Sequence, residues 1–61
     1  MRLVEFRRSS EPDGVVFVNQ AAVRMVQPNG EGTNIRFAHD HHVFVEERLS
    51  DVVRKLREVD R

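Results

Sequence analysis

Three histidines and an aspartate stand together at His39, Asp40, His41 and His42. Imidazole and carboxylate groups can bind zinc or nickel, so this cluster is the first place to look for chemistry. On an extended chain, however, His39 and His41 point to one side and His42 to the other. The cluster also falls in a predicted turn with no obvious group to orient the rings. The pattern favours a polar hairpin turn, with surface metal binding as the alternative, and no cofactor is expected.

The remaining titratable and nucleophilic groups do not form a catalytic set. Glu46 and Glu47 are adjacent, so they face opposite ways on an extended chain; they are more typical of a strand end that brings negative charge to a helix N-terminus. Ser9, Ser10 and Ser50 have no neighbouring base to activate them. A chain of 61 residues also has little room for a substrate pocket of roughly 300 Å³ or more. The sequence therefore predicts a protein that is not an enzyme.

A mixed aromatic and arginine surface is the better candidate for a functional site. If the alternating apolar residues of the predicted strands face a helix, the opposite face of a flat sheet carries Val15, Phe17, Arg24, Arg36 and Phe44. Aromatic and arginine side chains dominate protein-binding hot spots, and they also stack on unpaired bases. The long arginine stems could also simply cover the sheet.

We therefore predict partner binding through Phe17, Arg24, Arg36 and Phe44. The leading hypothesis is a non-catalytic accessory module that binds a protein partner or a second copy of itself. The alternative is a small DNA- or RNA-binding regulator that uses the same surface.

Composition bears on these two alternatives. Ten basic and ten acidic residues cancel, so no net charge draws the chain to nucleic acid or to an anionic membrane. The chain has no cysteine, which excludes disulfides and is compatible with a reducing cytoplasm. No apolar run approaches the roughly 20 residues of a membrane span, and no secretion signal is expected.

The elements that position this surface are visible as two hydrophobic periods. Alternating or β-branched runs predict strands at residues 2–7, 14–19, 23–26, 33–38 and 43–46. Turns are expected at residues 12–14, at a short corner over 19–22, at 39–42, and in a loop over 28–32 longer than the tightest hairpin turn. The predicted inward-facing residues are Val16, Val18, Val23, Val26, Ile35, Phe37, Val43 and Val45.

The period then changes from two residues to that of a helix. A single apolar stripe on a helix that begins near Leu49 is formed by Leu49, Val52, Val53, Leu56 and Val59. An ion pair between Asp51 and Lys55 is expected at a spacing of four residues. Arg48 cannot cap the helix with its side chain, and eleven residues make a marginal helix alone, so this helix must pack on the sheet.

The same succession of residues resembles the FlbD/SwrD family of small flagellar accessory proteins over residues 16–56. The matching positions are Val16-Phe-Val18-Asn19, Val23-x-x-Val26, Thr33-x-Ile35-x-Phe37, Val45-Glu-Glu47 and Leu49-x-x-Val52-Val53-x-x-Leu56. The order of elements is also similar, more weakly, to the first half of a LytTR DNA-binding domain. The first resemblance implies a bacterial, cytoplasmic role connected with flagellar function.

Together these patterns predict one α+β domain over residues 1–61. Its fold is a small antiparallel β meander of four to five strands, packed by one C-terminal amphipathic helix.

Overall fold

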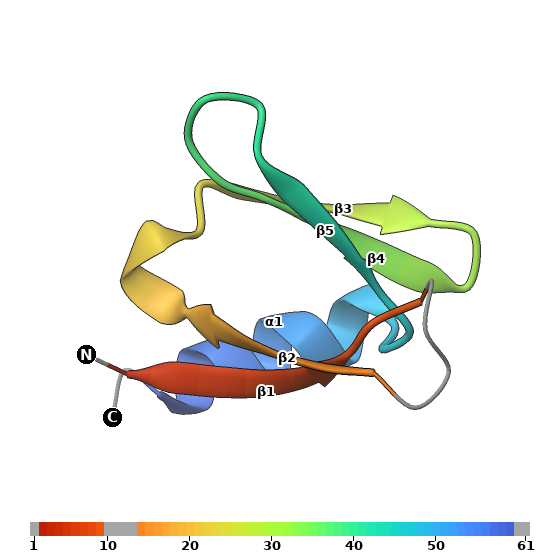
Figure 1. The fold of residues 1–61 in the computed structure, drawn as a ribbon. Helices are drawn as coiled ribbons and strands as arrows, with labels where there is room; N and C mark the ends of the chain where they lie inside the picture. The colour runs from red at the N-terminus through yellow and green to blue at the C-terminus, as the bar shows by residue number, and fades with distance from the viewer. Residues whose placement is uncertain (1, 10–13, 60–61) are drawn as a thin grey trace.

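The computed structural model describes residues 2–9 and 14–59, and residues 12 and 13 of the predicted first turn lie outside this part (Figure 1). Its elements in chain order are β1 (Leu3–Arg7), β2 (Val15–Asn19), the 3₁₀ helix η1 (Gln20–Ala22), β3 (Met25–Asn29), β4 (Gly32–Arg36), β5 (His42–Val45) and α1 (Leu49–Glu58). The predicted fold class, an antiparallel α+β fold with one C-terminal helix, is confirmed.

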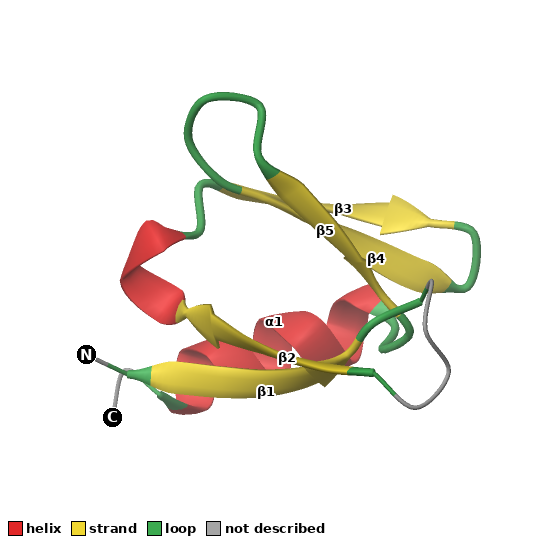
Figure 2. Ribbon diagram, viewed as in Figure 1, coloured by secondary structure: helices red, strands yellow, loops and turns green. Residues whose placement is uncertain are grey.

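The strands form two sheets, and the prediction of one flat sheet is wrong. β1 pairs with β2, and a separate sheet has the order β3-β4-β5, with every pairing antiparallel. Figure 2 shows the β1–β2 pair below the three-stranded sheet, with α1 behind them. The two sheets touch at one corner, where the Ser9 N–H donates to the Phe44 C=O (2.9 Å) and the Glu46 N–H donates to the Arg7 C=O (2.8 Å).

One hydrophobic core lies between the two sheets and the helix. Phe6, Ile35, Val45 and Val52 have no exposed surface, so each side of the enclosure contributes at least one fully buried side chain. All eight residues predicted to face inward are either buried or packed against this core: Val16, Val18, Val23, Val26, Ile35, Phe37, Val43 and Val45. The alternation within the strands therefore predicted the inner face correctly.

The β3–β4 hairpin has a two-residue loop, so the predicted longer loop is wrong. Asn29 pairs directly with Gly32, which leaves only Gly30 and Glu31 in the loop. Gly30 has a φ of 59°, and a glycine with positive φ at the first central position is typical of a type II′ hairpin turn. Gly32 serves packing instead, because a Cβ there would lie 2.2 Å from the Val45 carbonyl oxygen.

The predicted short corner over residues 19–22, which connects β2 to β3, is a turn of 3₁₀ helix. Asn19 caps this turn, its side-chain oxygen accepting a hydrogen bond from the Ala21 N–H (3.1 Å). Val23 follows as the C-terminal cap, so β3 begins at Met25, two residues later than predicted. The corner carries the chain from β2 to β3 without their pairing.

Helix α1 begins at Leu49, as predicted, and Arg48 makes no side-chain capping hydrogen bond. The predicted Asp51–Lys55 ion pair is wrong. Asp51 instead lies 3.5 Å from Arg54, and Lys55 lies 3.6 Å from the Glu47 carboxylate. Lys55 turns away from its own helix because partners on the neighbouring chain segments are within reach of its long stem.

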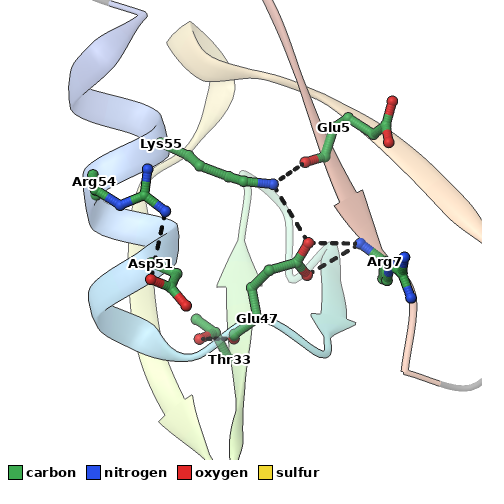
Figure 3. Close-up of polar contacts among 7 residues, drawn as sticks. All are labelled: Glu5, Arg7, Thr33, Glu47, Asp51, Arg54 and Lys55. Carbon is green, nitrogen blue, oxygen red and sulfur yellow. Dashed lines mark hydrogen bonds and ion pairs between the residues drawn. The ribbon is translucent and has the colours of Figure 1, made fainter.

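Glu47 and Lys55 form a polar link between α1 and β1, drawn in Figure 3. The Arg7 N–H donates to both oxygens of Glu47 at 3.1 Å, and the Lys55 ammonium donates to the Glu5 C=O at 3.0 Å. These side chains occupy backbone groups of β1 on the edge that faces β5. The Glu47 carboxylate therefore lies against β1, whereas the sequence pattern had suggested that it brings negative charge to the helix N-terminus.

Candidate interaction surfaces

The four residues predicted to bind a partner are divided between the two sheets. Arg36 and Phe44 lie on the outward side of β4 and β5, and Arg24 lies just before β3. Phe17 lies on β2, which belongs to the other sheet. The structure thus brings three of the four residues to one sheet and leaves Phe17 on a different surface.

Part of the outer surface of the three-stranded sheet is here called the basic face: Arg24, Met25, Arg36, His42 and Phe44. The ladder aligns Met25, Arg36 and His42 across the three strands, so their side chains share one row. Phe44 follows His42 on the same side of β5, and the two rings meet edge to face with centroids 5.0 Å apart. Met25 is 51% exposed and Phe44 is 40% exposed.

The two arginines of the basic face line one open hollow of about 460 Å³, together with Met25, Phe37, His39 and Asp40. Their backbones are adjacent, because the Arg24 N–H donates to the Arg36 C=O (2.9 Å). The ion pair from Arg36 to Asp40 is long at 3.9 Å, and the Asp40 side chain is 99% exposed. Such a pair contributes little, so the guanidinium is available to another carboxylate or to a phosphate.

A second surface lies on the outer side of β1 and β2 and is here called the apolar face: Leu3, Val15 and Phe17. These side chains are 54%, 50% and 60% exposed. Phe17 lies opposite Glu5 in the ladder and Val15 lies opposite Arg7, so charged groups border the apolar residues. Sequence reasoning did not include Leu3, although its alternation with buried Val4 already placed it outward.

Met25 is the other exposed residue missing from the prediction. It lies in the row of Arg36, and it was missed because β3 was expected to start at Val23. Together with the apolar face and Phe44, it completes the large hydrophobic side chains that are exposed in the described part of the chain. All of them project from the outer sides of strands.

The histidine turn does not assemble a metal site. His39 and Asp40 have φ angles of 59° and 62°, a left-handed conformation that His and Asp adopt more readily than most residues. His42 instead packs against Phe44, and its Nδ1 lies 3.2 Å from the Asp40 carbonyl oxygen. Within residues 2–9 and 14–59, no group of three or more His, Cys, Asp or Glu could hold a metal ion.

Comparison with models of known protein families, with curated proteins and with solved structures gave no match. No helix within the described ranges is long and apolar enough to cross a bilayer. The resemblance to the FlbD/SwrD family therefore stays a prediction. The findings identify the chain by its architecture, as a small α+β protein of two antiparallel sheets and one C-terminal helix.

Proposed function

We propose that this protein is a non-catalytic interaction module that binds a protein partner through the basic face. The observation that carries this proposal is the meeting of Arg24, Arg36 and the exposed Phe44 on one sheet surface. Guanidinium groups bind carboxylates with two parallel hydrogen bonds, and exposed aromatic rings add apolar contact area. The partner that fits is a protein segment in which acidic side chains alternate with apolar ones.

The shape of the surface supports a segment of a larger molecule over a small metabolite. The hollow beside the arginines is open and shares its rim with Met25, which is half exposed. An acidic side chain placed there would lie between Arg24 and Arg36. The residue two positions along an extended partner would then reach towards the His42–Phe44 pair, because alternate side chains share one face.

A nucleic-acid regulator is the second candidate, and one observation favours it. The exposed ring pair of His42 and Phe44 beside Arg36 could stack on unpaired bases while the arginine contacts a phosphate. The net charge of zero argues for the protein partner, because nucleic-acid binding draws most of its affinity from an excess of positive charge.

The biological setting of the proposal comes from the sequence resemblance. Similarity to the FlbD/SwrD proteins over residues 16–56 suggests a bacterial accessory role connected with flagellar function. The absence of cysteine is compatible with the cytoplasmic location that this role implies. Neither a cofactor nor a small-molecule substrate is part of the proposal.

The test is a titration of isotope-labelled protein with a short synthetic peptide of alternating Glu and Phe residues, followed by nuclear magnetic resonance. We expect the largest shift changes at the amides of Arg24, Met25, Arg36 and Phe44, with little change at Phe17. Arg36→Glu should weaken binding at least about tenfold, which corresponds to about 1.4 kcal/mol. Arg48→Glu is the matched control, because it makes the same charge change at an exposed residue away from this face.

Two results would overturn the proposal. One is an absence of peptide binding at millimolar concentration together with tight binding of a single-stranded oligonucleotide that weakens steeply with salt. The other is an equal loss of peptide binding in Arg36→Glu and Arg48→Glu, which would show that only overall charge matters.

A further inference from the structure

Strand β2 has a free edge beside the apolar face. The hydrogen bonds from the Gln20 N–H to the Arg2 C=O and from the Arg8 N–H to the Gly14 C=O fix which residues of the β1–β2 ladder are bonded pairs. In an antiparallel ladder these pairs alternate, so the N–H and C=O groups of Val15 and Phe17 point away from β1. Within the described ranges, no residue donates to or accepts from these outward groups.

Strand β3, one of the two edge strands of the other sheet, carries a protection that β2 lacks. The Phe37 N–H donates to the His41 C=O, so these two residues are a bonded pair between the chain segments of β4 and β5. Because bonded pairs alternate along the ladder, the odd-numbered residues of β4 bond β5. The even-numbered residues of β4 then bond β3, so Val26 and Pro28 face outward on the β3 edge. Proline has no N–H, and a proline on an edge strand prevents a further strand from pairing there.

The residues of β2 lack any such protection. The strand reads Val-Val-Phe-Val-Asn, with neither a charge nor a proline over its five residues. Natural proteins usually cover or block an edge of this kind, because it is a template for intermolecular strand pairing. An unprotected edge beside exposed apolar side chains therefore indicates a contact that is used.

We propose that the occupant of this edge is β2 of a second copy, paired antiparallel about a two-fold axis at Val16. In this register Val15 of each copy lies opposite Phe17 of the other, and both are bonded pairs. The four outward N–H groups of Val15 and Phe17 in the two copies then have four carbonyl acceptors. The contact is self-complementary, as a two-fold interface requires, and uses only backbone groups that have no partner among the described residues of one chain.

Side-chain chemistry favours this register over its neighbour. With the axis at Val16, Phe17 lies beside the partner's Val15, which is a favourable aromatic to β-branched pair. Each row across the four strands then runs from Arg7 of one copy to Glu5 of the other. This follows because Arg7 of β1 lies opposite Val15, and Glu5 of β1 lies opposite Phe17. With the axis at Phe17, Val15 would lie beside the polar Asn19 of the other copy. The row that contains the two Phe17 residues would then have Glu5 at both ends.

The net charge of the chain also permits association with a second copy. The formal net charge is zero, so two copies approach without long-range repulsion. The surface involved is separate from the basic face, so this self-association and the proposed partner binding can fail independently.

The first experiment is sedimentation equilibrium of the intact chain from about 5 µM to about 1 mM. We expect the mass to rise from one chain to two and to stop there. Val15→Pro removes one outward N–H per chain without touching the bonds to β1, and it should weaken association at least about tenfold. Met25→Lys, a new charge at a similarly exposed residue on the other sheet, should leave association unchanged. Circular dichroism checks that each variant is folded.

The second experiment tests the register and does not depend on the affinity of the proline variant. The chain has no cysteine, so Val15→Cys and Phe17→Cys introduce the sole thiols. Bonded antiparallel pairs have Cα atoms about 5.5 Å apart, within the range that a disulfide spans. A mixture of the two variants should cross-link at least about tenfold faster than either variant alone. A mass of one chain at every concentration, or equal cross-linking of the mixture and the single variants, would overturn the proposal.

Discussion

The two sheets of this protein share one core but present different outer surfaces. The β1–β2 pair exposes Leu3, Val15 and Phe17 beside an unprotected edge, whereas the β3–β5 sheet exposes arginines and ends in a strand that contains Pro28. The buried apolar residues of both sheets are of the same kinds, Val, Ile and Phe, and β4 adds the buried polar Thr33. The inner positions therefore contribute to the stability of the fold, while the outer positions and strand edges decide what each surface can bind.

The largest effect should come from contrasting the two phenylalanines of the β1–β2 pair. Phe6 is fully buried, and Phe6→Ala should cost about 3–5 kcal/mol in the free energy of unfolding, enough to abolish a cooperative transition in a chain this small. Phe17→Ala should change it by less than about 0.5 kcal/mol, because its ring is 60% exposed. Urea denaturation at a concentration of a few micromolar measures both. Similar losses in the two variants would contradict this assignment of inner and outer faces.

The next effect concerns the close contact inside the three-stranded sheet. Gly32→Ala should destabilise the protein by roughly 1–3 kcal/mol, since the added Cβ would meet the Val45 carbonyl and push β4 and β5 apart. Gly30→Ala is the control, because a Cβ there meets no atom within 4 Å and only the positive φ opposes it, at a cost of about 1 kcal/mol. Thermal unfolding checks the order, which would be refuted by a neutral Gly32→Ala.

A smaller effect should follow from removing the polar link that joins α1 to β1. Glu47→Ala deprives the Arg7 N–H and the Lys55 ammonium of an acceptor, at a cost of about 1–2 kcal/mol. Glu46→Ala removes an exposed carboxylate next to it and should cost less than about 0.5 kcal/mol. Amide hydrogen exchange gives a local reading, in which Arg7 loses protection in the first variant only. Unchanged exchange at Arg7 would show that Glu47 does not hold this amide.

The smallest change in stability is expected from replacing the proline on the edge strand β3, which should instead change association. Pro28→Val restores an outward N–H on β3 and should alter the free energy of unfolding by less than about 1 kcal/mol. Association should then proceed beyond two chains, because each copy would offer two pairing edges. Light scattering measures this, with Gln27→Val as the control, since the N–H of Gln27 already bonds β4. If Pro28→Val associates no further than the parent protein, the contrast between the edges is not set by this proline.

Local patterns account for most of what was predicted correctly. Alternation at Val16, Val18, Ile35 and Val45 placed them on the inner face because side-chain direction in a strand depends only on neighbouring residues. The start of α1 at Leu49 followed from the change to a helical period, which is also a local property. The loop of the β3–β4 hairpin was misjudged because Gly32 was counted as a turn residue, although its need for space comes from a distant carbonyl.

The period of apolar residues was enough to predict the strands, the helix and the direction in which most side chains point. The tertiary structure was needed to show that the strands form two sheets, that Phe17 is separated from Arg24, Arg36 and Phe44, and that Lys55 reaches Glu47 instead of Asp51. These outcomes depend on which strands pair and on which distant groups come within a few ångströms. No residue period encodes that information, because it arises only when the whole chain closes around Phe6, Ile35, Val45 and Val52.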